Sequence, residues 1–121
     1  MDSFVDCSNV YVKKGKYGYG AYAKKDFKKG ELIEKGIMTK LVNVDGNENP
    51  HLFTWSDDRK TWASASGCLP FYNHSDTPNI QKKGDLQNDL MEIIALRDIK
   101  KDEELCNTYF SKQWRACFQD F

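Results

Sequence analysis

Clusters of turn-forming residues recur along the whole sequence and leave room only for short secondary-structure elements between them. They lie at residues 15–20, 24–31, 45–50, 82–85 and 97–104. Glycine, proline, asparagine and aspartate each favour turns, for different stereochemical reasons. Turns at intervals of about eight to twelve residues indicate strands rather than long helices. The sequence therefore predicts a mostly β fold of short strands around a single core.

Apolar runs and alternating patterns locate the strands between these turns. We expect strands at residues 8–14, 21–23, 32–44, 51–55, 61–63, 90–96 and 105–109. The strand at 32–44 is expected to bend at Gly36, and the strands at 51–55 and 61–63 should form a hairpin. The strand at 90–96 is expected to be buried. Residues 63–70 are expected to be irregular.

The last residues follow a different period. Their apolar side chains recur at i, i+3, i+4 and i+7, which is one face of a helix, and are Trp114, Cys117, Phe118 and Phe121. Ser111 is suited to be the N-cap. We therefore expect a short C-terminal helix.

Length and charge restrict the function classes. The 121 residues suit one domain, 1–121, without repeats or linkers. Eighteen Lys and Arg balance eighteen Asp and Glu, which disfavours binding of nucleic acid by charge alone. No apolar run approaches the roughly 18 residues of a membrane span, and no secretory signal is evident. We expect an intracellular protein that does not bind membranes.

The four cysteines show no metal-binding spacing. Cys7, Cys68, Cys106 and Cys117 form no C-x-x-C pair, and neither histidine lies near paired cysteines. We interpret them as reduced structural thiols and expect no metal site.

Three segments contain residue types that can do chemistry. The first is the glycine-rich stretch at 17–20, the second runs from Tyr72 to Asn79 and includes an Asn-His pair, and the third runs from Asp102 to Tyr109. Taken alone, each has a scaffold interpretation: a hairpin turn, side chains that satisfy buried backbone groups, and a solvated acidic turn before a core tyrosine.

Taken together and in this order, the three segments resemble the SET-domain protein lysine methyltransferases. Residues 21–31 resemble an early strand and turn of that family, and 97–105 resemble its approach to a Glu-Glu-Leu motif. The resemblance covers about residues 9–115. In size the chain is similar to the small viral SET histone methyltransferases. It implies a β-clip-like fold with a knot-like crossing, which is rare in proteins, and no flanking zinc modules.

The resemblance also implies a cofactor site. SET enzymes transfer a methyl group from S-adenosylmethionine to a lysine amine and release S-adenosylhomocysteine. Backbone groups of the turn, Asn73, the backbone of His74 and an aromatic face would hold the cofactor. The implied cofactor-binding residues are Tyr17, Gly18, Tyr19, Asn73, His74 and Trp114.

On the substrate side, the resemblance implies that Tyr109 is the catalytic tyrosine and that Phe53, Tyr72 and Asn107 line the lysine channel. Deprotonating a free lysine at pH 7 costs roughly 4–5 kcal/mol. A nearby sulfonium and burial both lower the pKa of that lysine. The phenol of Tyr109 then needs only to orient the amine, so that positioning supplies much of the rate.

The substrate is the least defined part of the resemblance. Acidic residues at 45–48 and 57–58 could attract a basic histone tail, but we favour the simpler interpretation that they are solvated loop charges. A histone substrate implies a nuclear location, in a host nucleus if the protein is viral; otherwise a cytoplasmic one is expected. A SET core without flanking modules leaves apolar surface to cover. Our hypothesis is that a second copy of the chain covers it in a homodimer.

Three alternatives stay open at this point: an inactive SET-fold module that binds peptide, a methyltransferase acting on a non-histone protein, and a small β-rich structural protein.

Overall fold

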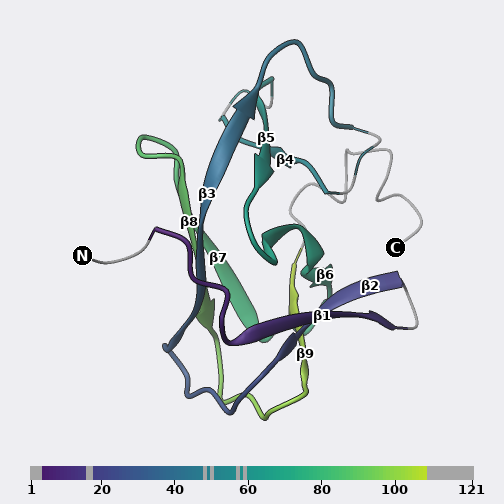
Figure 1. The fold of residues 1–121 in the computed structure, drawn as a ribbon, viewed down its shortest axis with the longest axis vertical. Coiled ribbons are helices and arrows are strands. Elements are labelled where there is room, and N and C mark those ends of the chain that lie inside the picture. The colour runs from purple at the N-terminus through teal and green to yellow at the C-terminus, as the bar shows by residue number, and fades with distance from the viewer. Residues whose placement is uncertain are drawn as a thin grey trace.

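The computed structural model describes residues 4–15, 18–47, 49, 51–56, 58 and 60–108, and these are mostly β (Figure 1). In chain order the elements are β1 Val10–Gly15, β2 Gly18–Ala23, β3 Leu32–Leu41, β4 Phe53–Thr54, β5 Trp62–Ala65, the 3-10 helix η1 Leu69–Phe71, β6 Asn73–His74, β7 Ile80–Asp85, β8 Leu90–Ala95 and β9 Glu104–Asn107. The mostly β prediction is confirmed. The expected C-terminal helix lies outside the described residues. Within the part described, no helix has the length and apolarity to cross a membrane.

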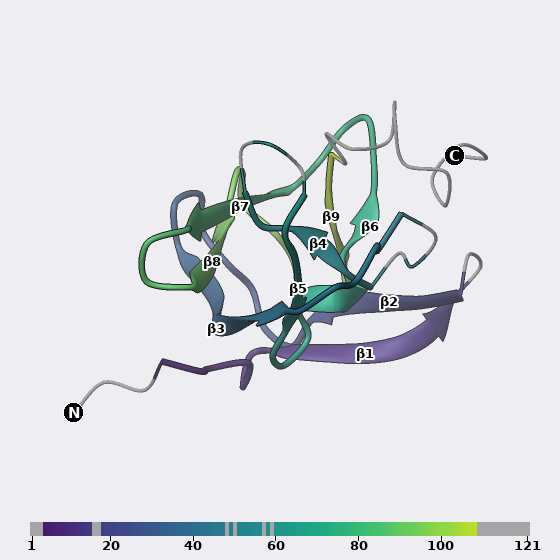
Figure 2. The ribbon, with the colours of Figure 1, turned by 90° about the horizontal axis from the view of Figure 1, so that it is seen from above.

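The strands form two sheets. One has the order β1-β2-β9-β6 and the other β4-β5-β3-β8-β7. All neighbours are antiparallel except β6 and β9, which pair in parallel. Figure 2 shows β6 and β9 side by side, with the β1–β2 hairpin running past them. A parallel pair requires a long connection, and here β7 and β8 of the other sheet lie within that connection.

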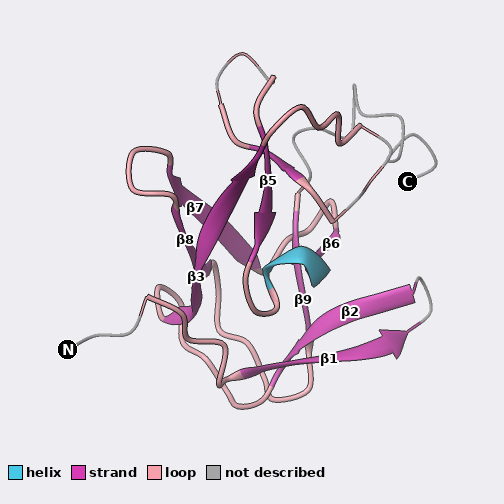
Figure 3. Ribbon diagram, turned by 45° about the horizontal axis from the view of Figure 1, so that its top comes forward, coloured by secondary structure: helices cyan, strands magenta, loops and turns pink. Residues whose placement is uncertain are grey.

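The core lies between the two sheets and under η1, which contacts both β2 and β5 (Figure 3). Ala21 and Ala23 of β2 are fully buried. Ile93 of β8 and Leu105 of β9 are also fully buried. Each such branched side chain contributes about 1.5–3 kcal/mol by leaving water.

The predicted hairpin and the predicted buried strand are confirmed. β4 pairs with β5 in the register Phe53↔Ala63 and Thr54↔Trp62. β8 lies between β3 and β7, and its alternate residues Met91, Ile93 and Ala95 are buried.

The predicted turn at residues 82–85 is wrong, because these residues belong to β7. This strand is at the edge of its sheet and only Ile80 in it is buried. Edge strands often contain lysine and other charged residues, since these discourage pairing with another chain. The charges at 82–85 therefore mark an edge rather than a turn, and the turn follows at residues 86–89.

The predicted bend at Gly36 is also wrong, since β3 continues through it and its irregularity lies between Leu32 and Glu34. A Cβ atom at Gly36 would lie 2.5 Å from Ser66 Oγ and 2.7 Å from Leu69 Cδ1. Glycine is needed there for close approach of the neighbouring segment. That segment is itself more regular than predicted, because β5 extends to Ala65.

Candidate active site

The Asn-His segment and the Glu-Glu-Leu segment lie side by side, as the resemblance requires. Asn73 pairs with Cys106 and His74 with Asn107, and the backbone N–H of Ser75 donates to the Asn107 carbonyl at 2.9 Å. This adjacency is confirmed, while the knot-like crossing of the chain stays a prediction. Several of the candidate site residues lie on these two paired segments.

The carboxamide of Asn73 connects three strands. Its Nδ2 donates to the Tyr19 carbonyl at 3.2 Å and to Glu104 Oε2 at 2.9 Å. A Cβ atom on Gly20 would lie 2.7 Å from that Glu104 oxygen and 3.0 Å from Asn73 Nδ2. The glycine-rich stretch is therefore a hairpin and also the close neighbour of the Asn-His segment. Both N–H groups of Asn73 are used, and the described residues give its Oδ1 no donor, so an acceptor is left over.

The other predicted residues of the glycine-rich stretch start β2. Gly18 has a φ of 98°, in the region that favours glycine, and pairs with Gly15 across the hairpin. Tyr19 is 60% exposed, and its ring lies roughly perpendicular to that of Phe71, with the two ring centroids 6.4 Å apart. The exposed Tyr19 ring, next to the carbonyl that accepts from Asn73, offers an aromatic surface to a ligand. Tyr17 lies outside the described residues.

His74 is held by its side chain as well as by its strand. Its imidazole is 8% exposed and its Nε2 lies 2.8 Å from Asp76 Oδ1. The side chain therefore has a local partner, and its structural role is to fix the turn that follows β6. A contact to an adenine through the backbone is compatible with this arrangement.

Asn107 has a buried acceptor without a donor. The side chain is 9% exposed and its Nδ2 donates to the Thr108 carbonyl at 3.1 Å, but Oδ1 has no hydrogen-bond partner within the described part of the chain. A buried polar atom left unpaired costs about 1–3 kcal/mol. A ligand bound at this predicted site would have an acceptor available in Asn107 Oδ1.

Tyr72 and Phe53, the predicted channel residues, are brought together around Lys82. The Lys82 ammonium lies 4.4 Å from the Phe53 ring centroid and 5.9 Å from that of Tyr72. Tyr72 is 1% exposed and its hydroxyl donates to Glu34 Oε1 at 2.6 Å. Burial, followed by the Glu34 charge, raises the pKa of Tyr72 well above its usual value, so its hydroxyl stays protonated. These aromatic rings already hold an alkylammonium group.

Glu34 is a functional neighbour that the sequence analysis missed. The carboxylate is 1% exposed and also accepts the backbone N–H of Cys68 at 2.8 Å. Burial raises its pKa, opposed by these hydrogen bonds. A lone glutamate within an apolar strand, Leu-Ile-Glu-Lys-Gly, is the signal that could have revealed it.

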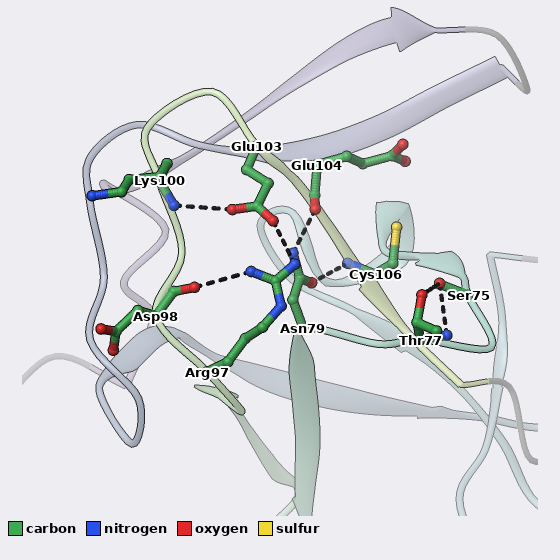
Figure 4. A network of polar contacts seen from close by, with 9 residues as sticks. All are labelled: Ser75, Thr77, Asn79, Arg97, Asp98, Lys100, Glu103, Glu104 and Cys106. Carbon is green, nitrogen blue, oxygen red and sulfur yellow. Dashed lines mark hydrogen bonds and ion pairs between the residues drawn. The ribbon is translucent and has the colours of Figure 1, made fainter.

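Asn79 is the second residue whose role the sequence analysis left unassigned. Figure 4 shows its carboxamide facing β9: Nδ2 donates to the Glu104 carbonyl at 2.7 Å, and Oδ1 accepts the Cys106 N–H at 2.8 Å. The side chain is 3% exposed. Asn79 thus bonds the backbone of β9 through both its donor and its acceptor. It holds β9 in place, and the chain continues from β9 to Tyr109.

The same network contains an ion pair at the turn before β9. Arg97 bonds the Glu103 carboxylate and the Asp98 carbonyl, and Glu103 accepts the Lys100 N–H (Figure 4). Arg97, first among these causes, holds the pKa of Glu103 below its usual value. The acidic turn is therefore ordered by this ion pair and by backbone hydrogen bonds, and it leads directly into β9.

Two central predictions cannot be placed. The catalytic Tyr109 and the adenine-stacking Trp114 lie outside the described residues, so their roles stay predictions.

Comparison with known proteins identifies this arrangement. A family model for the SET domain matches residues 18–110. A histone-lysine N-methyltransferase of Schizosaccharomyces pombe, specific for H3 lysine-37, is 32% identical over 88 residues, 73% of this chain. The chain spans about half, 54%, of the length of that curated relative.

Solved structures agree with the fold. A candidate histone methyltransferase of Plasmodium falciparum superimposes with a TM-score of 0.66 at 26% identity, covering 84% of this chain and 92% of that one. The polycomb repressive complex 2 of Chaetomium thermophilum superimposes with a TM-score of 0.68 at 22% identity, covering 86% of this chain and 15% of that one. A structure of this complex bound to S-adenosylmethionine has a TM-score of 0.70 at 21% identity, over 88% of this chain and 16% of that one.

Proposed function

Since the chain belongs to the SET-domain family, we propose that it is a protein-lysine N-methyltransferase that uses S-adenosylmethionine and acts on a histone. The observation that carries the proposal is the junction of β6 and β9. There Asn73 and Asn107, on neighbouring strands, each have a carboxamide oxygen that receives no donor from the described residues. Two such acceptors suit two cationic ligands, a cofactor ammonium and a lysine.

The residues fit the cofactor. S-adenosylmethionine, when bound, supplies an electrophilic sulfonium methyl group. Asn73 Oδ1 would accept from the ammonium of its amino-acid portion, with the Glu104 carboxylate 2.9 Å from Nδ2 of the same carboxamide. Backbone groups of Tyr17, Gly18 and Tyr19 would complete this polar end, and His74 and Trp114 would hold the adenine. Methyl transfer of this kind uses no metal ion.

The chain's own groups would position the amine. Asn107 Oδ1 would accept one N–H of the substrate lysine, and the phenol of Tyr109 would orient its lone pair. Tyr72 and Phe53 would wall the channel, because aromatic rings attract alkylammonium groups. Burial beside a positive sulfonium lowers the lysine pKa, so a separate general base is not required.

A histone is the substrate that the relatives support. The names of the yeast and Plasmodium falciparum proteins specify histones, and a nuclear location follows from such a substrate. Two of the acidic loop residues have local partners: Asp45 accepts the Asn47 N–H and Asp58 accepts the Lys60 N–H, so both side chains stabilise their own turns. Substrate choice then depends on the channel and its rim.

Two further properties belong to this proposal. Exposed apolar side chains such as Val42, 82% exposed, and Phe4, 66% exposed, support a homodimer, for which light scattering at micromolar concentration would give the mass. The balanced charge supports protein recognition without sequence-specific binding of nucleic acid. The likeness to the small viral SET enzymes stays a prediction.

The test is mass spectrometry of histones and of a cell lysate after incubation with the protein and S-adenosylmethionine. We expect methylated lysine on a histone, abolished in Tyr109→Phe. That variant should bind the cofactor as the parent does, whereas Asn73→Ala should bind it about 10–100-fold more weakly, the value of one or two hydrogen bonds to a charged group.

Each other outcome has a definite meaning. Methylation only of non-histone proteins would contradict the substrate assignment. Cofactor or peptide binding without any methylation would support an inactive binding module. Full activity of Tyr109→Phe would remove Tyr109 from catalysis.

A further inference from the structure

Three potential metal ligands from distant parts of the chain meet around Glu34 of β3. Cys7, Glu34 and Cys68 each place a ligand atom within 4.8 Å of those of the other two. They come from the N-terminal segment, from β3 and from the residue before η1. No residue of this group belongs to the cofactor or lysine site proposed above.

The position of Cys7 is fixed by backbone pairing. Asp6 N–H donates to the Lys35 carbonyl at 2.9 Å and Lys35 N–H donates to the Asp6 carbonyl at 3.1 Å. Cys7 therefore follows a bridge to the residue after Glu34, and its carbonyl accepts the Val10 N–H at 3.2 Å. The thiol is brought to the cluster by the fold and not by a loose chain end.

The loop at Gly67 is built closely around the same group. Gly67 has a φ of 59°, and a Cβ atom there would lie 2.6 Å from Glu34 Oε2 and 3.3 Å from Cys7 Sγ. Only glycine permits this backbone to approach the carboxylate and the thiol together. Cys68, the next residue, donates its N–H to the same Oε2 at 2.8 Å.

Both carboxylate oxygens of Glu34 are oriented by hydrogen bonds. The hydroxyl of Tyr72 holds Oε1 at 2.6 Å, which leaves Oε2 directed at the cluster. A carboxylate oxygen has two lone pairs, so Oε2 can accept the Cys68 N–H and still coordinate a cation. Ligating carboxylates are commonly oriented by such outer hydrogen bonds. Both cysteines are half-buried, so an ion can enter.

We propose that Cys7, Glu34 and Cys68 bind one Zn²⁺ ion through two thiolates and a carboxylate, with solvent as the fourth ligand. Thiolate ligands select zinc over magnesium and calcium, and four-coordinate zinc accepts this mixed set. On binding, each thiol releases its proton to solvent and no electrons are exchanged. The ion would tie the N-terminal segment to the loop that leads into Tyr72 and Asn73. This revises the sequence-based expectation of structural thiols only, because Cys7 and Cys68 become neighbours only in the fold.

The experiment measures metal on the full-length reduced protein. The protein is stripped with a chelator, mixed with zinc chloride and dialysed, and zinc per chain is determined by elemental analysis. Cobalt chloride serves as a second probe, because cobalt–thiolate bonds absorb strongly in the near ultraviolet. We expect one ion per chain, a cobalt–thiolate band and a higher melting temperature with zinc.

Variants locate the ion. Cys7→Ser and Cys68→Ser should each weaken zinc binding by at least about 100-fold and reduce the cobalt–thiolate band. Tyr72→Phe keeps all three ligands and should weaken binding by about 10–100-fold, the usual effect of an outer-shell partner. Cys106→Ser and Cys117→Ser are the matched controls and should bind zinc as the parent does. Because Cys7 is half-buried, Cys7→Ser is expected to fold even if a change at Glu34 is not tolerated.

Each contrary result overturns the proposal. A parent protein that binds no zinc, zinc retained in Cys7→Ser, or zinc lost in either control would do so. A Cys7–Cys68 disulfide in protein isolated without reductant, with no zinc bound after reduction, would show that the cluster is a redox pair instead. Metal content is measured without substrate, so failure of methyl transfer would leave this result unaffected.

Discussion

The five-stranded sheet and the β6–β9 junction are held in place by different forces. In the sheet, Ile93 and its neighbours are buried by an alternating apolar pattern and pair with both adjacent strands. At the junction, β6 has two residues and β9 four, and side-chain amides supply much of the bonding. The sheet is stabilised mainly by the hydrophobic effect, which is non-directional and grows with the apolar area buried. The junction is stabilised by a few hydrogen bonds, which are directional. Stability is therefore concentrated in one region and the candidate chemistry in the other.

The largest effect is expected from the sheet. Ile93→Ala removes a fully buried side chain from β8 and should lower the free energy of unfolding by about 2–5 kcal/mol. Urea denaturation measures this loss. Where the variant remains folded, its cofactor affinity should match the parent's. A large loss of affinity in folded protein would show that the two regions are coupled.

The junction should be nearly as sensitive to one amide. Asn79→Ala removes two hydrogen bonds and leaves the Cys106 N–H and the Glu104 carbonyl without that partner. We expect a loss of about 2–3 kcal/mol in the free energy of unfolding, together with a fall in methyl-transfer rate, because β9 leads to Tyr109. Asn88→Ala, an exposed amide bonded to Asp85, is the control and should change stability by about 0.5 kcal/mol or less.

Asn107 should separate stability from function. Asn107→Leu replaces an acceptor that has no donor among the described residues by an apolar group of similar size, but it also removes the Nδ2 bond to the Thr108 carbonyl. The free energy of unfolding should therefore change by no more than about 1 kcal/mol. The methyl-transfer rate should fall about tenfold, equivalent to one hydrogen bond to the lysine amine. Thermal denaturation and single-turnover assays measure the two quantities. Lower stability with unchanged turnover would place Asn107 in the scaffold.

The smallest effect is expected at the turn before β9. Arg97 lowers the pKa of Glu103, so this contribution to stability is present above the unfolded glutamate pKa of about 4.3 and is lost as pH falls through the lowered folded pKa. Glu103→Gln should therefore cost about 0.5 kcal/mol at pH 7, in keeping with a part-exposed ion pair.

A pH series of denaturation curves tests this sign. The difference between Glu103→Gln and the parent should disappear toward pH 3. A difference that grows with acid would mean that Glu103 stabilises β9 in its protonated form.

Sequence patterns predicted the strands whose residues alternate regularly between apolar and polar, or that flank a clear turn. The alternation in β8 and the hairpin of β4 and β5 are examples, because side chains of a strand alternate between core and solvent. The pattern failed at β7, where an edge position replaces apolar alternation by lysine, and at Gly36, where a neighbouring segment and not a bend requires glycine. Edge positions and close approaches depend on partners that no local window contains.

For the candidate site, ordered motifs indicated which residues belong together before any geometry was known. Asn73 and the glycine-rich hairpin do meet, through the Tyr19 carbonyl. The motifs contained the partners that fix their geometry, Glu104 and Asn79, but not the groups that these two side chains bond, because those groups lie on other strands. Phe53 and Tyr72 also meet, with Lys82 between them.

The sequence by itself determined the fold class, the family resemblance and the candidate residues, because these depend on the types and spacing of side chains along the chain. Only the tertiary structure decided which polar groups face one another. It paired β6 with β9, buried Asn107 Oδ1 where the described residues offer it no donor, and brought Cys7 and Cys68 to Glu34. The physical reason is range: hydrophobic burial is read from local periodicity, whereas a hydrogen bond or a metal ligand set requires groups from distant segments to meet within a few ångströms.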